Sequence, residues 1–395
     1  MAKTLSQLDF KGKRVLLRCD LNVPIAQNGS ILNDFRIKQS APTIKYLTDR
    51  GAKVILISHL GDPGGRIIES LRLDRIKEKL ADFLNQPVLK TNDCIGSSAK
   101  EMVETMQDGE VLLLENIRFY KEEEANDEQF AKELANLGDI YINDAFGVCH
   151  RKHASVVGIP KYLPSAAGLL LEKEIKVLSR VLENPWRPLA VVIGGVKIST
   201  KIKMIEKFIK LADNVLIGGG IANTILIGKS VMVGFPLPEK EILKKINKID
   251  LTNTKIHLPI DGIIALKDKG EEFIRQGAIG VAKKEEAVLD IGPETIKIFK
   301  KIIQEAKMIV WNGPLGLSED KRFENGTKEV AEAIVRNYSA FKVAGGGETV
   351  EALSKFDVFD KFDHVSTGGG AMLDFLSGEK LPGILAIDPV RVPRQ

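Results

Sequence analysis

The chain has 395 residues, enough for two or three domains with their own cores. Its 57 basic and 53 acidic side chains nearly balance, and the net charge of +4 gives no support to a nucleic-acid or membrane partner. The N-terminal residues lack the apolar stretch of a signal peptide, and no apolar run approaches the roughly 20 residues of a membrane span. The three cysteines (Cys19, Cys94 and Cys149) lack CxxC spacing, so we expect a cytoplasmic protein without a zinc site.

The first half of the chain alternates short apolar runs with helical patterns. We predict strands at 14–19, 53–58, 111–115 and 140–144, and helices at 36–50, 72–85, 97–107 and 127–137. This alternation predicts an α/β domain with a mainly parallel, doubly wound sheet. Ligands of such sheets bind beyond the carboxyl ends of the strands, so functional residues should directly follow the strands.

Residues 169–187 have a different pattern. Leu171, Ile175, Leu178 and Leu182 are spaced as one face of a helix, and Asn184-Pro185 then ends it. We interpret this segment as a linker helix between a first domain (1–168) and a second domain (188–379). The tail, about 380–395, is extended and proline-rich, and its pattern alone does not place it.

Cationic and hydrogen-bonding side chains gather at or near the predicted strand ends of the first half. They are Arg18, Asp20, Asn22, Arg36, His59, Arg118, His150, Arg151 and His153. If the strands are parallel, these side chains converge on one edge of the sheet. Arginine forks match carboxylate and phosphate oxygens, and Asp20 and Asn22 could bind a hydroxyl group. The pattern therefore indicates a small anionic substrate.

Each of these residues also has a structural interpretation. A single arginine is more often a surface ion-pair partner than a ligand, and Asp20 could be a turn or cap residue. His153 could be a structural histidine. We interpret the charged run 121–128 as the solvated start of a helix.

Five apolar runs of the second half end in glycine-containing turns. They lie at 191–197, 215–220, 309–316, 343–349 and 364–371, and helical patterns follow most of them. A strand, a glycine turn and a helix N-terminus present free N–H groups and a positive dipole end, which together bind phosphate. The repetition predicts a nucleotide site at this sheet edge.

Lys197 and Lys201 lie four residues apart after the first of these runs. On a helix start they would stack on one face, where two ammonium groups could hold a polyphosphate. The alternative is an amphipathic helix with solvated lysines. The common phosphate motifs fail, because Asn223 replaces a glycine of both the P-loop and the dinucleotide fingerprints, and Leu373 replaces the last glycine after Gly368.

Motifs along almost the whole chain resemble those of phosphoglycerate kinases. They include RCDLNVP (18–24), SHLGDPGG (58–65), LLLENIRF (112–119), NDAFG (143–147), KISTKI (197–202), VWNGPLG (310–316), GGGET (345–349) and STGGGA (366–371). The resemblance implies two doubly wound α/β domains joined by a hinge helix, with the tail packed on the first. It implies reversible transfer of a phosphoryl group between 1,3-bisphosphoglycerate and MgADP in a cytoplasmic monomer, with in-line transfer on hinge closure.

The resemblance also implies roles for individual residues. Asp20, Asn22, Arg36, His59, Arg118 and Arg151 would hold phosphoglycerate. Lys201, Gly218, Gly219, Gly220, Glu319, Gly345, Gly346, Gly347 and Glu348 would bind the nucleotide, with Glu348 as the carboxylate on the Mg²⁺ side. Arg36, Lys197, Gly346 and Gly369 would act on the transferring phosphoryl group, to which the N–H groups of 368–370 donate.

Three positions depart from the family pattern. Asp62 stands where the family usually has arginine, and we hypothesise that Arg66 substitutes for it. Glu348 replaces the usual aspartate, and Ser318 replaces an aromatic residue. Two other classes remain as alternatives, a non-catalytic nucleotide or phosphate sensor and an NAD-dependent dehydrogenase. The missing fingerprint argues against the dehydrogenase, and turnover would exclude the sensor.

Overall fold

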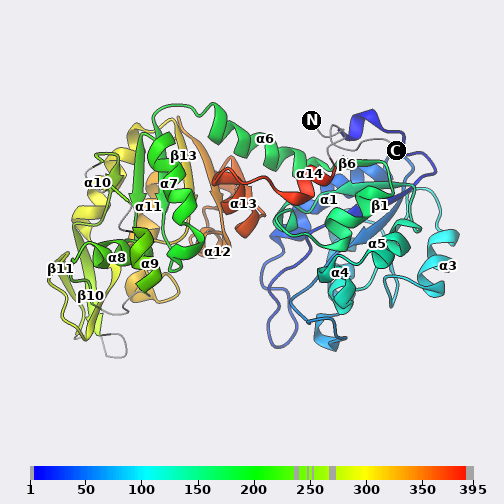
Figure 1. Ribbon diagram of the computed structural model, residues 1–395, viewed down its shortest axis with the longest axis horizontal. Helices are drawn as coiled ribbons and strands as arrows, with labels where there is room; N and C mark the ends of the chain where they lie inside the picture. Colours follow the sequence, from blue (N-terminus) through cyan, green and yellow to red (C-terminus); the bar gives the residue numbers. More distant parts are fainter. Residues whose placement is uncertain (1–3, 235–239, 247–248, 251–252, 267–272, 388–395) are drawn as a thin grey trace. The chain divides into compact units, whose positions relative to one another are not determined.

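The computed structural model describes residues 4–234, 240–246, 249–250, 253–266 and 273–387, drawn as a ribbon in Figure 1. Contacts within the chain define two compact units, Met1–Lys176 with Lys380–Gln395, and Val177–Glu379. The division falls inside helix α6 (Leu169–Glu183), which therefore contributes residues to both units. No helix of the described residues is long and apolar enough to span a bilayer.

The first unit contains a six-stranded sheet in which all neighbouring strands run parallel, in the order β3-β4-β2-β1-β5-β6. The strands are β1 (Arg14–Arg18), β2 (Lys53–Ile57), β3 (Val88–Lys90), β4 (Val111–Leu113), β5 (Ile140–Asn143) and β6 (Ser165–Ala167). β1, β2, β4 and β5 confirm the four predicted strands. β3 and β6 were not predicted, because three residues at a sheet edge carry no readable periodicity.

Helices of the first unit confirm the predicted alternation. They are α1 (Phe35–Thr48), α2 (Asp74–Leu84), α3 (Ser97–Thr105), α4 (Lys121–Ala125) and α5 (Glu128–Ala135). Ile44 of α1 and Leu80 of α2 share one buried cluster with Val15, Leu17 and Val54 of the sheet. The strand order reverses at β1, with β2 on one side and β5 on the other, and doubly wound sheets bind ligands at such a point.

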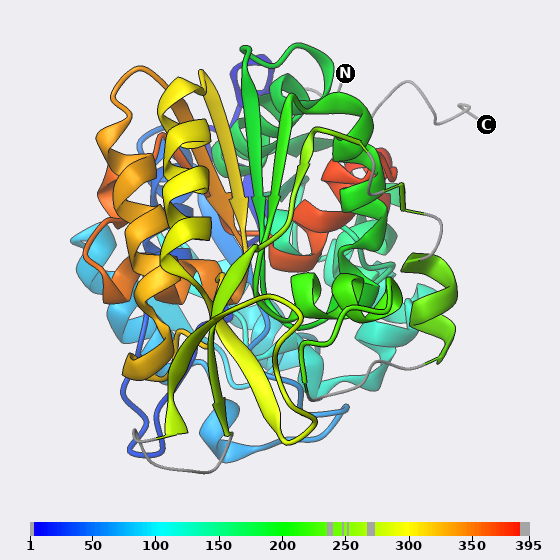
Figure 2. The same cartoon turned by 90° about the vertical axis from the view of Figure 1, so that its left-hand side faces the viewer.

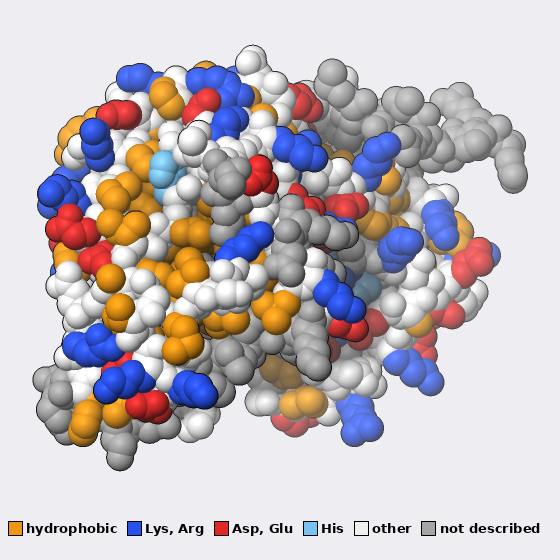
Figure 3. Space-filling view, turned by 60° about the vertical axis from the view of Figure 1, so that its left-hand side comes forward, with side chains coloured by type: hydrophobic (Ala, Val, Ile, Leu, Met, Phe, Trp, Pro, Cys, Tyr) orange, Lys and Arg blue, Asp and Glu red, His pale blue; other side chains and the backbone are white. Residues whose placement is uncertain are grey.

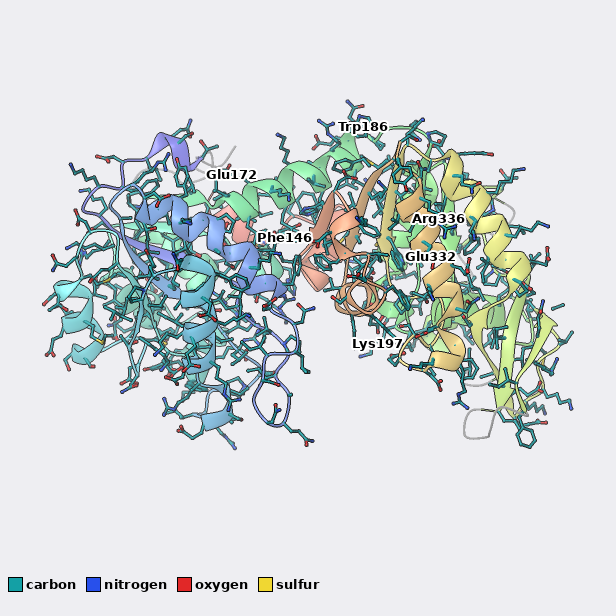
Figure 4. The ribbon with its side chains drawn as sticks, turned by 180° about the vertical axis from the view of Figure 1, so that it is seen from behind. Phe146, Glu172, Trp186, Lys197, Glu332 and Arg336 are labelled. Carbon is teal, nitrogen blue, oxygen red and sulfur yellow. The ribbon has the colours of Figure 1, made fainter. Side chains whose placement is uncertain are left out.

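The predicted linker helix is present as α6, and its first turn is held by the first unit. The side chain of Asp144, just after β5, accepts hydrogen bonds from the backbone N–H groups of Leu170 (3.0 Å) and Leu171 (3.2 Å). Burial raises the pKa of this carboxyl to about 7 although the hydrogen bonds oppose the shift. Beyond the other end of α6 lies Trp186, which is labelled in Figure 4. It packs edge-on against Phe341 of the second unit, at 5.4 Å between ring centroids.

The second unit contains another six-stranded parallel sheet, ordered β15-β14-β13-β7-β8-β9. The strands are β7 (Leu189–Ile193), β8 (Asn214–Ile217), β9 (Ile256–His257), β13 (Met308–Asn312), β14 (Phe341–Gly345) and β15 (His364–Ser366). All but β9 were predicted from apolar runs that end in glycine turns. The chain order reverses between β7 and β13, so the turns after these two strands lie side by side.

Helices lie on both faces of this sheet (Figure 2). They are α7 (Ile202–Leu211), α8 (Gly219–Gly228), α9 (Lys240–Ile246), α10 (Pro293–Glu305), α11 (Asn325–Arg336), α12 (Gly347–Lys355) and α13 (Gly369–Leu376). Phe299 of α10 and Ile334 of α11 share a core with Val192 and Trp311 of the sheet. Together the two parallel sheets confirm the predicted fold class.

A small antiparallel sheet, ordered β11-β10-β12, was not predicted. Its strands are β10 (Asp261–Leu266), β11 (Arg275–Ala278) and β12 (Glu286–Ile291). The sequence RQGA of β11 has little strand propensity. This segment is a strand because it pairs with β10, and its own sequence does not predict that partner. Ile264 and Val288 pack with Leu226 of α8 in a small separate cluster.

Part of the predicted tail returns to the first unit. Helix α14 (Pro382–Ala386) lies against the segment after β5, where the backbone N–H of Gly383 donates to the carbonyl of Cys149 at 2.8 Å. A side chain at Gly383 would clash, because its Cβ would lie 2.7 Å from Val156 Cγ1. The rest of the predicted tail, 388–395, lies outside the described residues.

Acidic and basic side chains are interspersed over the face drawn in Figure 3, in keeping with the nearly balanced composition. Functional charge must therefore be local.

Candidate active site

The loop after β1 brings Asp20, Asn22 and Arg36 together. Arg36, in the first turn of α1, donates from Nη1 to the carbonyl of Asn22 (3.0 Å) and to Asp20 Oδ1 (3.3 Å). Asp20 is buried and also accepts from the N–H of Asn22 at 3.3 Å, so it serves as a turn residue and as an arginine partner at once. The Arg36 side chain keeps 29% of its surface exposed, so its guanidinium is held in place and still reachable.

The loop after β2 is fastened to this group through Gly61. Its N–H donates to Asn22 Oδ1 (2.9 Å), and its carbonyl accepts from Arg118 Nη1 (2.8 Å). Gly61 has φ +64°, a left-handed conformation that favours glycine. Asn22, Gly61 and Arg118 therefore form a continuous chain of hydrogen bonds across the carboxyl ends of β1, β2 and β4.

His59 lies just after β2 and is almost fully buried. Its Nδ1 lies 3.3 Å from Nη2 of Arg18, which can only donate, so Nδ1 is the acceptor and Nε2 carries the proton. Burial and the charges of Arg18, Arg118 and Arg36 hold the pKa of His59 well below its usual range. The imidazole is therefore a neutral donor among cations.

Arg18 is the patch residue whose importance the sequence did not reveal. It is 1% exposed, and its Nε donates to Ser155 Oγ at 2.8 Å. Ser155 in turn donates to Glu123, from Oγ at 2.6 Å and from its N–H at 2.8 Å. Arg18 thus lies behind the other cations and orients His59, while its own charge is opposed by the buried carboxyl of Glu123.

Glu123 corrects one interpretation of the sequence. The run 121–128 was expected to be a solvated helix start, and α4 does begin at Lys121, but Glu123 is fully buried. Its Oε1 lies 3.8 Å from Nδ1 of His153, which is 8% exposed. Burial and the nearby arginines lower the pKa of His153 to about 4, so it is a neutral, buried part of the patch.

Arg151 and Cys149 follow β5. Arg151 is exposed, and its charge acts on Arg118. Among the described residues its guanidinium has no hydrogen-bond partner. Cys149 is buried, and burial raises the pKa of its thiol to about 12, so it is not a reactive nucleophile. Asp62, the first departure, and Arg66, its hypothesised substitute, are both exposed, and the charge of Asp62 acts on Arg118.

In the second unit, the turns after β7 and β13 meet where the strand order reverses. The N–H of Gly194 donates to the carbonyl of Asn312 (3.0 Å), and the N–H of Gly195 donates to the carbonyl of Pro314 (2.7 Å). Lys201 spans this junction, because its Nζ donates to the carbonyls of Gly194 (2.7 Å) and Asn312 (3.2 Å). Burial lowers the pKa of Lys201 to about 8, and the charge of Glu348 opposes this shift.

The two lysines do not stack on one helix face, contrary to the prediction from their spacing. A 3-10 turn, Ile198–Thr200, separates them, and α7 begins only after Lys201. Lys197 is exposed and has no hydrogen-bond partner for its ammonium in the described part of the chain (labelled in Figure 4), whereas Lys201 is buried. The first is available to a ligand, and the second holds the site together.

The glycines after β8 allow close approach of backbones. The N–H of Gly218 donates to the carbonyl of Ile193, and the N–H of Gly219 donates to the carbonyl of Leu315, both at 2.9 Å. Gly219 has φ +62°, and a Cβ there would lie 2.9 Å from the carbonyl oxygen of Pro314. A Cβ at Gly220 would lie 3.2 Å from the Cα of Val196. These glycines therefore let α8 approach the turn after β7.

The turn after β14 places Glu348 beside Lys201. Asn312 Nδ2 donates to the carbonyl of Gly345 (2.7 Å), and Gly346, with φ +101°, precedes the first turn of α12. Glu348 is exposed, yet a Cβ on Gly195 would lie 2.8 Å from its Oε2 and 3.2 Å from Lys201 Nζ. The carboxylate, the ammonium and the bare backbone of Gly195 thus border one small space.

The turns at 345–347 and 368–370 each open a helix whose first N–H groups have no partner within the helix. A Cβ at Gly347 or at Gly369 would meet no atom within 4 Å, so both turns are open. Glu319 is also exposed, and no hydrogen bond holds its carboxylate among the described residues. Ser318 beside it is 8% exposed.

Glu348 is the candidate for contact with Mg²⁺. In the described residues no three His, Cys, Asp or Glu side chains are grouped to hold a metal by themselves. Mg²⁺ is commonly bound by one or two carboxylates together with substrate phosphates, and the exposed Glu348 beside the phosphate-type turns fits that mode.

A cationic patch on one α/β unit, and glycine turns around two lysines on the other, are the features of a small-molecule phosphotransferase. A family model described as phosphoglycerate kinase matches residues 5–379. A phosphoglycerate kinase of Dictyoglomus turgidum is 45% identical over 383 residues, covering 96% of each chain, and one of Pelotomaculum thermopropionicum is 44% identical over 389 residues, covering 98% of each. The chain therefore belongs to the phosphoglycerate kinase family.

Solved structures agree with this assignment. Phosphoglycerate kinase from Coxiella burnetii has a TM-score of 0.83 and 37% identity, covering 98% of this chain and 99% of the other. The enzyme from Pyrococcus horikoshii has a TM-score of 0.85 and 32% identity, covering 98% of each. The predicted class is confirmed: the chain is a kinase of glycolysis that transfers a phosphoryl group between 1,3-bisphosphoglycerate and ADP.

Proposed function

We propose that the cationic patch of the first unit binds phosphoglycerate and that the turns of the second unit bind the Mg²⁺ nucleotide. The observation that carries the first assignment is the hydrogen-bonded chain from Asp20 and Asn22 through Gly61 to Arg118. Asp20 and Asn22 also hold the half-exposed guanidinium of Arg36, whose charge acts on the neutral imidazole of His59. Such a surface matches a ligand with a phosphate, a hydroxyl and a carboxyl group.

The reaction needs little covalent help from the protein. An oxygen of the ADP β-phosphate attacks phosphorus, the bond from phosphorus to the carboxyl oxygen breaks, and the electron pair leaves with the carboxylate of 3-phosphoglycerate. A carboxylate is a weak base, so no general acid has to protonate it. Positioning and charge neutralisation carry phosphoryl transfer, and arginine and lysine supply them.

Arg36 is the proposed catalytic arginine. Its guanidinium is anchored by Asp20 and by the carbonyl of Asn22, which fixes its direction, while 29% of its side chain stays exposed. Neutral His59 would donate its Nε2 proton to a substrate oxygen. Arg118 and Arg151 would neutralise the phosphate that is not transferred.

Lys197, Lys201, Gly346 and Gly369 are the proposed partners of the transferring group and the nucleotide phosphates. Lys197 is unpaired among the described side chains and can follow a moving phosphoryl group, while Lys201 is fixed. Mg²⁺, when bound with the nucleotide, would neutralise phosphate charge, and Glu348 would be its protein carboxylate. Glu319 would contact the ribose.

The proposal requires both units to act on the same phosphoryl group, and a single chain carries every proposed residue.

We also propose a cytoplasmic location, which the three buried free thiols of Cys19, Cys94 and Cys149 support.

Turnover of MgATP and 3-phosphoglycerate, read through a dehydrogenase that consumes NADH, tests these roles. Arg36→Ala and Lys197→Ala should each lower kcat by at least about 100-fold, as loss of a charge aimed at the transition state does. Lys38→Ala removes an exposed lysine of α1, the helix of Arg36, and Lys210→Ala removes an exposed lysine of α7, the helix that follows Lys197; both should leave kcat unchanged. Retained turnover in Arg36→Ala would refute its role, and no turnover in the wild type with both ligands bound would indicate a sensor.

A further inference from the structure

Helix α12 holds the loop between β13 and α11 at two points. Near its N-terminus, the buried Thr349 accepts from the N–H of Gly313 at 2.7 Å through Oγ1. At its C-terminus, Lys355 donates from Nζ to the carbonyl of Ser318 at 2.6 Å. The same ammonium pairs with the carboxylate of Glu324 at the start of α11. The loop from Gly313 to Ser318 is therefore fastened at both ends to one helix.

Glu319 directly follows the second of these points. Its other neighbour, Asp320, is fixed by Arg322, whose Nη2 donates to Oδ2 at 2.6 Å. The N–H of Asp320 also donates to the carbonyl of Leu317 at 3.0 Å. Glu319 is thus an exposed carboxylate on a segment that is anchored on both sides. On its N-terminal side, the contact of Lys355 with Ser318 adds to the N–H of Leu317, which donates to the carbonyl of Leu289 at 2.9 Å.

We propose that Lys355 is a positioning residue for nucleotide recognition, which sets Glu319 against the ribose by holding the carbonyl of Ser318. Helix α12 carries Glu348 in its first turn and Lys355 as its last residue, so one rigid element fixes both exposed carboxylates of the nucleotide site. Lys355 itself contacts the Ser318 carbonyl and Glu324, and its side chain is 34% exposed. This inference rests on the proposed role of Glu319.

The proposal predicts a selective loss. Replacing Lys355 by Met keeps the length and the apolar stem of the side chain but removes the donor to Ser318. Glu319 should then lose its fixed position, while Glu348, the glycine turns and Lys201 remain held by other contacts. Affinity should fall for nucleotides that carry ribose hydroxyls and should not change for nucleotides that lack them.

Isothermal titration of the full chain with ATP and with 2′,3′-dideoxy-ATP, both with Mg²⁺, measures this selectivity. In Lys355→Met we expect about fivefold weaker binding of ATP, the size of one net hydrogen bond, with unchanged binding of the dideoxy nucleotide. KM for 3-phosphoglycerate should not change. Lys355→Arg retains a donor and should restore at least half of the lost discrimination. Lys328→Met, which removes an exposed lysine of α11, is the matched control and should behave as the wild type.

A double-mutant cycle separates this proposal from the role of Glu319 itself. If Glu319→Ala abolishes discrimination and Lys355→Met adds nothing to it, Lys355 acts through Glu319. If Glu319→Ala leaves discrimination intact, the ribose contact is wrong. If Glu319→Ala abolishes discrimination but Lys355→Met binds both nucleotides as the wild type does, the positioning role is wrong. A merely destabilised Lys355→Met would unfold earlier on heating without changing the ratio of the two affinities, and that result also refutes the proposal.

Discussion

Nη2 of Arg18 lies 3.3 Å from Nδ1 of His59, and both side chains are buried at the carboxyl ends of β1 and β2. Because a guanidinium only donates, this contact fixes the imidazole as the tautomer protonated at Nε2. The pKa of His59 lies well below its usual range, since burial and three arginines oppose a further positive charge. His59 should therefore work as a fixed neutral donor and not as a proton-transfer group.

This assignment predicts a flat pH profile. kcat/KM for 3-phosphoglycerate should show no inflection from His59 between pH 6 and 8, because the group stays neutral in the free enzyme. His59→Gln supplies a neutral N–H donor and should raise KM by less than about threefold, whereas His59→Ala should raise it about tenfold, as loss of a hydrogen bond to a charged group does. An inflection near pH 6.5 that disappears in His59→Gln would contradict the neutral donor.

His153 should make the first unit less stable in acid. Its pKa is about 4 in the folded chain, below the value of 6.5 expected when unfolded. Between these values the unfolded state binds more protons, so the free energy of unfolding falls as pH decreases from about 6.5 towards 4. Urea unfolding of the wild type and of His153→Gln at pH 7.5 and at pH 5 isolates this contribution, because the raised pKa of Asp144 favours the folded state in acid equally in both chains. The wild type should show the less favourable change of stability between the two pH values.

The control is His257→Gln, because His257 lies in the second unit and hydrogen-bonds Asn214 there. It should leave the acid sensitivity of the first unit unchanged. An equal loss of stability between the two pH values in wild type and His153→Gln would show that His153 does not carry the effect.

Asp62 should weaken binding of phosphoglycerate. Asp62 lies in the loop that is joined to Arg118 through Gly61, and its charge acts on the Arg118 guanidinium. The same carboxylate would repel a phosphate bound at Arg118. Asp62→Asn should therefore lower KM for 3-phosphoglycerate by about two- to threefold, the size of an exposed charge interaction. The same assay on Arg66→Ala tests whether Arg66 supplies the missing cation: an unchanged KM would exclude it.

Most of the fold could be predicted because buried parallel strands are continuous apolar runs that end in glycine turns. The position of the Lys201 ammonium, in contrast, could not be predicted from the sequence pattern. The four-residue spacing from Lys197 suggested one helix face, yet the 3-10 turn between them and the junction of β7 with β13 decide where each ammonium lies. Partners distant in sequence are invisible to periodicity, which is why Arg18 with Ser155, and Glu123 with His153, emerged only from the structure.

Nucleotide binding should take up protons in mildly alkaline solution. Burial lowers the pKa of Lys201 to about 8, so part of the ammonium is neutral in the free chain above that pH. Phosphate oxygens favour the charged form, and binding should raise this pKa and draw a proton from the buffer. The affinity for MgATP should therefore fall as pH rises from 8 to 9.5.

Calorimetric titrations of MgATP at pH 8.5, in two buffers with different ionisation enthalpies, measure the uptake directly. We expect an uptake of a sizeable fraction of one proton in the wild type and none in Lys201→Met, which should also bind MgATP more weakly. Lys210→Met, an exposed lysine of α7, provides the matched control and should keep the uptake. If Lys201→Met takes up as many protons as the wild type, another group titrates and Lys201 stays charged throughout this range.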